Sequence, residues 1–246
     1  MISIFKKTFA LAASLLLLCF LVQAQNKWSK YEVGINAGTF IYQGDLTPAT
    51  YGSFKTPGLV IGINGSNQLT PTILLRVDLN VGRLNGNDAK YSVPAWRQQR
   101  AFAFHDKVTE IIGSIVYHPL GVDTRLSPYL FGGAGFSNLT VRRDYSKFNA
   151  AYFATEELDK KLAADIAHSL PKSIPIIPVG VGVRYGLTNK IAISTEASYR
   201  IMSTDYLDGF SIAANPDLKD HYYKYSVGLI YSFNKRNRYD CPVIKP

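Results

Sequence analysis

The chain has 246 residues, of which 47% are hydrophobic and 13% aromatic, and its formal net charge is +9 at pH 7. Beyond the first 25 residues the apolar side chains are dispersed, which excludes further transmembrane helices, because a helix needs about 20 consecutive apolar residues to cross a bilayer. Dispersed apolar residues and frequent glycine are typical of many short strands separated by turns, here in a single domain.

The first 24 residues have the three parts of a secretory signal peptide. Lys6 and Lys7 supply the positive region, residues 8–22 the apolar region, and Val22-Gln23-Ala24 a small-residue cleavage site before Gln25. A membrane-spanning helix is the alternative, but the apolar stretch is shorter than a bilayer core requires. We therefore expect residues 1–24 to be removed during export.

Eight later segments are predicted strands, and most of them alternate apolar residues with polar or small ones, the pattern of a strand that has one apolar face. The fifth, residues 128–139, is apolar on both faces, so its register is ambiguous. The clearest runs from Ile73 to Val81, where Leu75, Val77 and Leu79 alternate with polar side chains. Each segment reaches the roughly 9 to 11 residues that a tilted membrane strand needs. The predicted strands are 31–42, 58–68, 72–84, 107–118, 128–139, 176–187, 190–200 and 222–233.

The connections between these segments alternate in length, as the short periplasmic turns and long external loops of membrane barrels do. Residues 69–71, 119–127 and 188–189 are the short connections, and residues 43–57, 85–106, 140–175 and 201–221 are the long ones. The sequence therefore predicts an eight-stranded antiparallel up-and-down transmembrane β-barrel over residues 25–233, in the bacterial outer membrane. Its long loops would be extracellular and both chain ends periplasmic.

The third long loop has helical periodicity of its own. Between residues 156 and 170, Leu158, Leu162 and Ile166 recur at helical spacing with charged residues between them. A short amphipathic helix is predicted, and its apolar stripe would pack on its own loop, cover the barrel mouth or meet a partner. The first of these is the simplest expectation.

A soluble β-sandwich or lipocalin-like barrel is the alternative fold, and it would turn its apolar residues inward. Here the polar set is mostly Gly, Ser and Asn, which suits a crowded lumen better than a solvated exterior. The interior of an eight-stranded barrel is filled by side chains, so we expect no wide channel, and ion pairs rather than a proton or ion path. The charged residues predicted to form this lumen network are Arg76, Asp78, Glu110, Arg184, Glu196 and Arg200.

The last predicted strand carries a pattern like the signal that the outer-membrane assembly machinery reads. Ser226, Gly228, Tyr231 and Phe233 place a polar residue, a glycine and then two aromatic residues at alternate positions. The assembly machinery is therefore a predicted partner.

Residues 234–246 follow that strand as a predicted periplasmic basic tail. Lys235, Arg236 and Arg238 make it too charged for a membrane strand. Cys241 would be the only cysteine after removal of the leader, either free or paired with another molecule.

Five short motifs occur in an order that resembles a known family. They are Tyr31-Glu32-Val33-Gly34, Tyr42-Gln43-Gly44-Asp45-Leu46, Gly82-Arg83-Leu84-Asn85-Gly86-Asn87-Asp88, Ser127-Pro128-Tyr129-Leu130-Phe131-Gly132-Gly133-Ala134-Gly135 and Thr204-Asp205-Tyr206-Leu207-Asp208. Together they resemble a domain-of-unknown-function family of small outer-membrane barrels that includes the PorG-like component of type IX secretion. The resemblance covers nearly the whole mature chain. It implies a barrel near the periplasmic ring of that secretion machine, with ring lipoproteins as partners.

Three functional classes follow: a non-enzymatic accessory of type IX secretion that contacts periplasmic components, a structural or adhesive OmpA-like barrel, and a lipid-modifying barrel enzyme. The enzyme would need Ser, His and an acid together on the lipid face, and no motif marks such a group. We predict no enzyme activity, no catalytic residue, no cofactor and no metal site. The basic charge of an exported chain favours outer-membrane lipids over nucleic acid as partners.

Two groups of residues are candidate metal ligands, and neither has the required spacing. The four histidines, His105, His118, His168 and His221, are scattered without ligand spacing. The acidic stretch of Asp205, Asp208, Asn215, Asp217 and Asp220 lacks the spacing of a calcium loop. We expect that stretch to be a solvated turn.

Overall fold

A computed structural model of the chain describes residues 30–49, 51–155, 157–204, 206–215 and 219–233. The predicted signal peptide, residues 1–24, and the predicted tail, residues 234–246, lie outside the described residues. No helix in the described ranges is long and apolar enough to cross a membrane.

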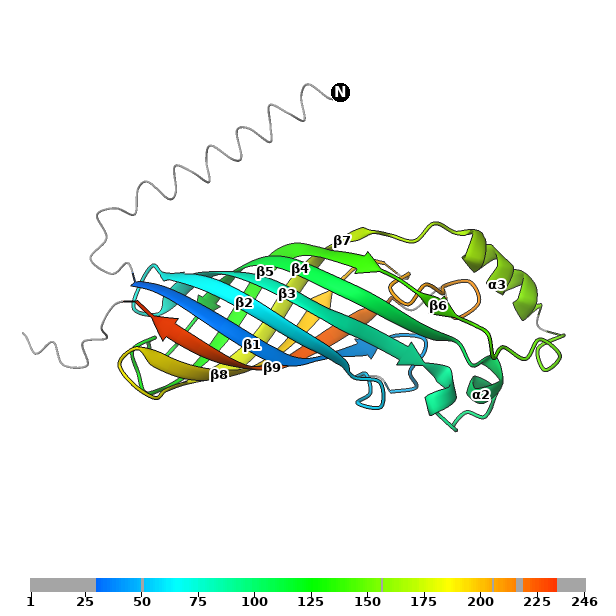
Figure 1. The fold of residues 1–246 in the computed structure, drawn as a ribbon, viewed down its shortest axis with the longest axis horizontal. Coiled ribbons are helices and arrows are strands. Elements are labelled where there is room, and N and C mark those ends of the chain that lie inside the picture. Colours follow the sequence, from blue (N-terminus) through cyan, green and yellow to red (C-terminus); the bar gives the residue numbers. More distant parts are fainter. Residues whose placement is uncertain (1–29, 50, 156, 205, 216–218, 234–246) are drawn as a thin grey trace, which may run out of the picture.

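Eight long strands form one closed antiparallel barrel (Figure 1). They are β1 (Lys30–Gln43), β2 (Gly58–Gln68), β3 (Ile73–Asn87), β4 (Ala103–Tyr117), β5 (Leu126–Thr140), β7 (Ser173–Gly186), β8 (Ile191–Ile201) and β9 (His221–Ser232). Each pairs with its neighbour in the chain, and β9 pairs with β1, which closes the sheet. The predicted fold class and all eight predicted strands are confirmed.

The external loops carry short elements of their own. These are η2 (Asp88–Lys90), α2 (Trp96–Arg100), β6 (Arg143–Asp144) and α3 (Leu158–Ala167). Of these, only α3 was predicted. They gather at one end of the barrel, whereas the short turns and the two ends of the described chain lie at the other (Figure 1). There the amide of Phe233 donates a hydrogen bond to the carbonyl of Tyr31.

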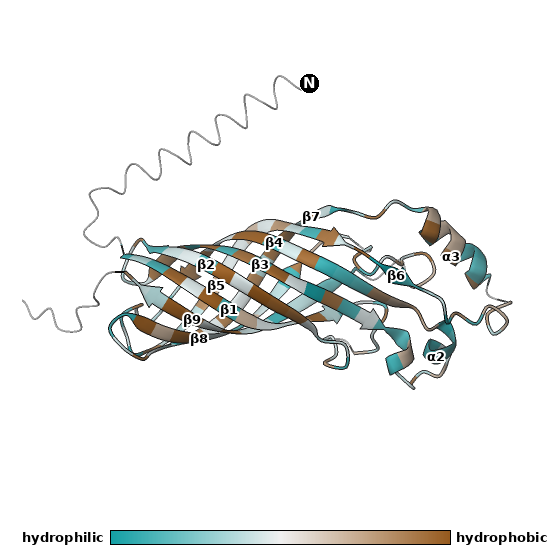
Figure 2. Cartoon of the chain, in the orientation of Figure 1, coloured by the Kyte–Doolittle hydropathy of each residue, from teal (hydrophilic) through white to brown (hydrophobic). Residues whose placement is uncertain are grey.

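Hydrophobic residues alternate with more polar ones along the strands of the barrel (Figure 2), and the exposed apolar side chains form an apolar band on its outward face. On β3, the side chains of Leu75, Val77 and Leu79 are 43%, 54% and 44% exposed, whereas those of Arg76 and Asp78 are 9% and 5% exposed. Because a strand turns successive side chains to opposite faces, this register sends both charges of β3 within the band, Arg76 and Asp78, inward. The orientation is that of a membrane barrel.

The polarity of the two faces reverses above this band, toward the external end. On β4, His105, Lys107 and Thr109 point outward, whereas Phe104 and Val108 are fully buried. The external part of β4 is therefore organised like the wall of a soluble barrel, with a polar exterior and, apart from the buried Asp106, an apolar interior. The reversal also explains why β3 and β4 extend three and four residues beyond their predicted external ends, since the predicted strands were bounded where the outward residues became polar.

Candidate functional site

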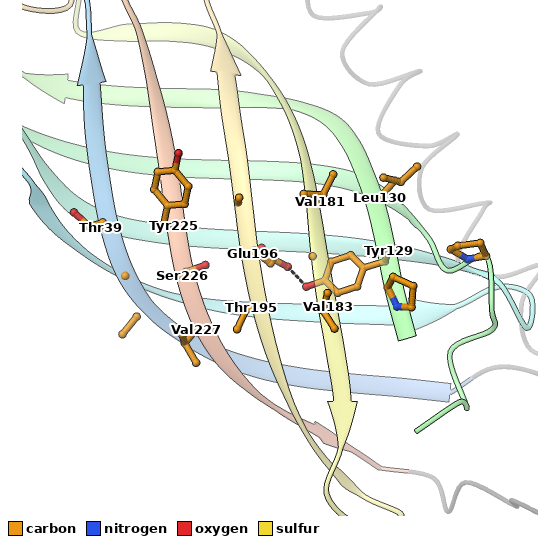
Figure 3. A pocket seen from close by; sticks show the side chains of 16 residues that line it. Thr39, Tyr129, Leu130, Val181, Val183, Thr195, Glu196, Tyr225, Ser226 and Val227 are labelled. Atoms are coloured by element: carbon orange, nitrogen blue, oxygen red, sulfur yellow. Dashed lines mark hydrogen bonds between the residues drawn. The ribbon is translucent and has the colours of Figure 1, made fainter. Parts of the chain in front are cut away.

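The first half of the lumen network is centred on Arg76. Its guanidinium donates to Asp78 at 3.0 Å and also to Glu196, across the lumen on β8. The hydroxyl of Tyr129, on β5, donates to the same carboxylate of Glu196 at 2.7 Å (Figure 3). The guanidinium carbon of Arg76 lies 4.5 Å from the centre of the Phe131 ring. Side chains from β3, β5 and β8 are thus held together inside the barrel.

The second half is centred on the fully buried carboxylate of Glu110. It accepts from Arg200 at 3.0 and 3.2 Å, from the hydroxyl of Tyr222 at 2.6 Å and from the amide of Asn80 at 2.9 Å. The ammonium of Lys224 donates to the side-chain oxygen of Asn80 at 2.7 Å. Every acceptor site of Glu110 therefore faces a donor.

A separate cluster lies at the periplasmic end of the lumen. Arg184 binds Glu32 through two hydrogen bonds of 2.7 Å, and the hydroxyl of Ser232 donates to Glu32 at 2.6 Å. A ring nitrogen of His118 lies 2.7 Å from the hydroxyl oxygen of Ser127 in the same region. This Ser–His pair is buried inside the lumen rather than on the lipid face.

The structure places all six residues of the predicted network inside the barrel, but it divides them. Five lie in the central lumen, whereas Arg184 lies apart and pairs with Glu32, a residue that sequence reasoning missed. Tyr129, Tyr222 and Lys224 were also missed. The alternation along β9 could have identified two of them, because Tyr222 and Lys224 share its inward face with Ser226.

Little free space remains between these groups. A void of about 10 Å³ is lined by Arg76, Glu196, Arg200 and Lys224, and another of about 30 Å³ lies beside His118 and Arg184. Spaces of this size hold about one or two waters. Side chains fill an interior of this diameter, and the small size of these voids among the described residues agrees with the prediction of no wide channel.

The external loops form a compact cap with an apolar core. Phe102 and Phe210, from the second and fourth long loops, stack with their ring centres 4.5 Å apart. Leu158 and Leu162 of α3 join the same buried cluster as Phe104 of the barrel wall. The apolar stripe of α3 therefore covers the barrel mouth rather than packing only on its own loop, while Ile166 remains exposed.

Buried carboxylates fasten the loops of the cap to one another. Asp165 on α3 accepts from the backbone amides of Ser211, Ile212 and Ala213 in the fourth long loop, at 3.3, 3.1 and 2.8 Å. Within the second long loop, Asp88 binds Arg97 at 2.7 Å and Arg100 at 2.5 Å. Both arginines also donate to the carbonyl of Asp45 in the first long loop, at 3.0 and 3.1 Å. Each loop is therefore held through hydrogen bonds as well as apolar contacts.

The predicted solvated turn at Asp208 and Asp220 is wrong, because both side chains are buried in the cap. The hydroxyl oxygen of Tyr42 lies 2.7 Å from Asp208 and 2.6 Å from Asp220. A hydroxyl has one proton to donate, so one of these contacts requires a proton on the carboxyl group. Burial, reinforced by the charge of Asp45, raises the pKa of Asp208 well above its ordinary value. Burial therefore favours the protonated form of Asp208.

The raised pKa of Asp208 makes the cap sensitive to pH. Because the folded pKa of Asp208 is raised, its contribution to stability is complete below the ordinary Asp pKa and is lost as the pH rises toward the raised value, by up to about 1.4 kcal/mol per pH unit. We expect Asp208→Asn to flatten the pH dependence of cap opening, measured by hydrogen exchange of loop amides between pH 4 and 9. Asp159→Asn, on the exposed face of α3, is the control and should leave that dependence unchanged.

The residues of the predicted assembly signal lie on or beside β9. Ser226 points into the lumen, whereas Tyr231 and Phe233 point outward with their ring centres 5.4 Å apart. Because β9 joins β1 to close the barrel, this strand completes the fold. Its recognition by the assembly machinery remains a prediction. Within the described ranges, no group of three or more His, Cys, Asp or Glu side chains is placed to hold a metal ion.

Two apolar grooves cross the outward face of the band. One of about 810 Å³ runs across β1, β9, β8, β7 and β5, between outward side chains that include Leu130, Val181 and Val227 (Figure 3). The other, of about 820 Å³, crosses β8, β9, β1, β2 and β3. Both are open toward the surroundings of the barrel and are lined mainly by apolar side chains.

Comparison with known proteins gives one family and several similar folds. The family model described as domain of unknown function (DUF6089) matches residues 9–233. No curated protein matches the sequence. The fold matches that of bacterial outer-membrane barrels.

Three solved structures illustrate that similarity. Neisserial surface protein A is 16% identical with a TM-score of 0.48, and the match covers 82% of this chain and 97% of that one. Ail, the attachment invasion locus protein of Yersinia pestis, in complex with the heparin analogue sucrose octasulfate, is 12% identical with a TM-score of 0.46 over 83% and 99%. The outer membrane enzyme PagL is 13% identical with a TM-score of 0.39 over 81% and 97%.

Proposed function

This chain belongs to the domain of unknown function family DUF6089, and we propose that it is a non-enzymatic outer-membrane barrel that anchors other proteins instead of passing solutes. The predicted membership of a domain-of-unknown-function family is confirmed. The PorG-like role, the cleaved signal peptide and the basic periplasmic tail belong to the proposal.

The observation that carries this proposal is the filled lumen. Three cations, Arg76, Arg200 and Lys224, occupy the central lumen together with the three carboxylates Asp78, Glu110 and Glu196. The cap closes the external mouth above them. A barrel whose lumen is filled and whose external mouth is capped is suited to anchoring in the membrane, with its external and periplasmic ends available for contact with other proteins.

The partner that we propose is the periplasmic apparatus of type IX secretion, through its ring lipoproteins. The sequence resemblance supports this assignment, and so does the position of the described chain ends, which lie on the side of the short turns. The cleaved leader would deliver the chain to the outer membrane, and the residues after Phe233 would then begin on the periplasmic side.

A structural or adhesive barrel is the second candidate, and the cap favours it. The folded external loops expose Tyr145, Tyr152 and Ile166 to the outside. Such side chains are suited to contact with a neighbouring surface.

Capture of partners from detergent-solubilised outer membrane separates the two candidates. With a tagged barrel we expect ring lipoproteins in the eluate, and a chain truncated after Asn234 should keep the heat-modifiable migration of a folded barrel while capturing less of them. An eluate of barrel alone would favour the structural or adhesive role. Equal capture by the truncated chain would exclude the tail as the contact.

The closed lumen is tested separately by electrical recording. In planar bilayers the purified barrel should show no steady conductance of porin size, because side chains fill an interior of this diameter. Large and stable single-channel steps would show that the lumen is open, and so would contradict the observation on which the anchoring proposal rests.

A further inference from the structure

Two cations stand side by side on the outer surface of β3 and β4. Arg83 and Lys107 are direct cross-strand partners, and both side chains are exposed on the outward face. Directly opposed residues in a sheet have Cβ atoms about 4.5–5.5 Å apart, and like charges at that distance destabilise the pair. None of the ion pairs among the described residues includes either side chain.

Further donors extend this pair across the same face of the wall. The exposed side chain of Arg142 follows β5, and its carbonyl accepts from the amide of His105 at 3.0 Å. The ring of His105 lies 2.9 Å from the amide oxygen of Asn85. One acid, Asp144, lies nearby on β6, and it accepts hydrogen bonds from Ser146. We call Arg83, Lys107, Arg142 and His105 the basic patch.

The basic patch lies at the edge of the apolar band. Val81, on the same face of β3 and two residues before Arg83, is 56% exposed and lines the 820 Å³ groove described above. The other walls of the groove include the exposed side chains of Ile61, Ile63 and Leu79. An anionic headgroup on the basic patch would therefore have its acyl chains beside an apolar groove.

The opposite sector of the barrel has a different chemistry at its external end. There Tyr199, Tyr223 and Tyr225 cluster on β8 and β9, and Phe54 of the first long loop lies 5.5 Å from Tyr225. Aromatic side chains of this kind occupy the membrane interface without selecting a charge. The concentration of cations over β3, β4 and β5 is thus a property of one sector.

We propose that the basic patch and the adjoining groove bind a phosphorylated glycolipid of the outer leaflet, with a phosphate on Arg83 and Lys107 and an acyl chain along Val81 and Ile61. The phosphate removes the repulsion between the two cations and forms charge-assisted hydrogen bonds with them. The adjacent apolar groove favours a lipid over a free anion, because only the lipid has an acyl chain that can lie in it.

The test measures lipid retained by the intact chain. The barrel is purified in a neutral detergent and exposed to bis-phosphorylated lipid A, and bound lipid is counted by native mass spectrometry. We expect Arg83→Gln with Lys107→Gln to weaken retention about 30-fold, the factor that two such contacts near an anionic surface supply. Lys160→Gln with Lys161→Gln removes the same charge from the exposed face of α3 and should leave retention unchanged. Heat-modifiable migration checks that every variant is folded.

Three further probes identify the source of the bound anion. Dephosphorylated lipid A and inorganic phosphate alone should each bind far more weakly than lipid A, because the first lacks the charge and the second lacks the chains. Competition by inorganic phosphate at equal concentration would overturn the lipid assignment. So would equal retention by the double variant, or a sulfated glycan that binds through Arg83 and Lys107 when lipid A does not.

Discussion

Replacing Val77 by Arg should abolish or sharply reduce assembly of the barrel. Val77 points outward in the middle of the apolar band, and its neighbours across both adjacent strands are glycines, Gly65 and Gly113. Neither neighbour offers a partner for a charge. An Arg or Lys near the bilayer midplane of a barrel costs about 2–4 kcal/mol, a large share of the stability of a domain.

The matched control places the same side chain outside the band. Asn138 also points outward, but it lies in the polar external part of the wall beside Thr109. We expect Asn138→Arg to assemble normally, as judged by heat-modifiable migration and by the amount of protein in the outer membrane. Normal assembly of Val77→Arg together with failure of Asn138→Arg would place the lipid boundary elsewhere and contradict the assigned register.

Loss of the Glu110 carboxylate should be the most destabilising change in the lumen. Glu110→Ala leaves the buried guanidinium of Arg200 without its counter-charge and the hydroxyl of Tyr222 without its acceptor. Removing one partner of a buried ion pair costs about 3–5 kcal/mol, because the remaining charge stays desolvated. Urea unfolding of the barrel in lipid or detergent, with and without the substitution, measures this loss.

Two comparison variants separate charge from packing. Glu157→Ala removes a carboxylate whose pair with Lys160 is exposed on the cap, so we expect a loss of no more than about 0.5 kcal/mol. Adding Arg200→Met to Glu110→Ala should restore part of the stability, because no unpaired charge is then buried. If the double variant is as unstable as Glu110→Ala, packing around the carboxylate rather than the stranded cation is the cause.

The sequence by itself determined the barrel: its strand number, its register toward lipid and the sides of its loops. A lipid exterior demands an apolar side chain at every second position, so a strand with clear alternation carries its own orientation, as Leu75, Val77 and Leu79 show. The predicted strand 128–139 is the exception, because it is apolar on both faces and only the structure decided its register. The alternating lengths of the connections then distinguished the external end from the periplasmic end. These are local patterns, and they needed no knowledge of what lies across the lumen.

Only the tertiary structure decided which charges meet. Arg76 and Glu196 are 120 residues apart, and Arg184 and Glu32 are 152 residues apart. Their contact depends on how non-neighbouring strands are staggered around the closed barrel, which alternation within one strand does not specify. For this reason the predicted set of six was divided between two clusters, and Lys224 and Tyr222 entered the network unpredicted.

The cap was also beyond the reach of local patterns. Asp208 and Asp220 lie in a polar loop, and a polar loop is expected to be solvated. The structure buries them because Tyr42 of β1, together with Phe102 and the leucines of α3 from other loops, excludes water from the barrel mouth. Burial is a property of the assembled loops, so the sequence determined where the loops begin and end, and tertiary packing decided that they close the barrel.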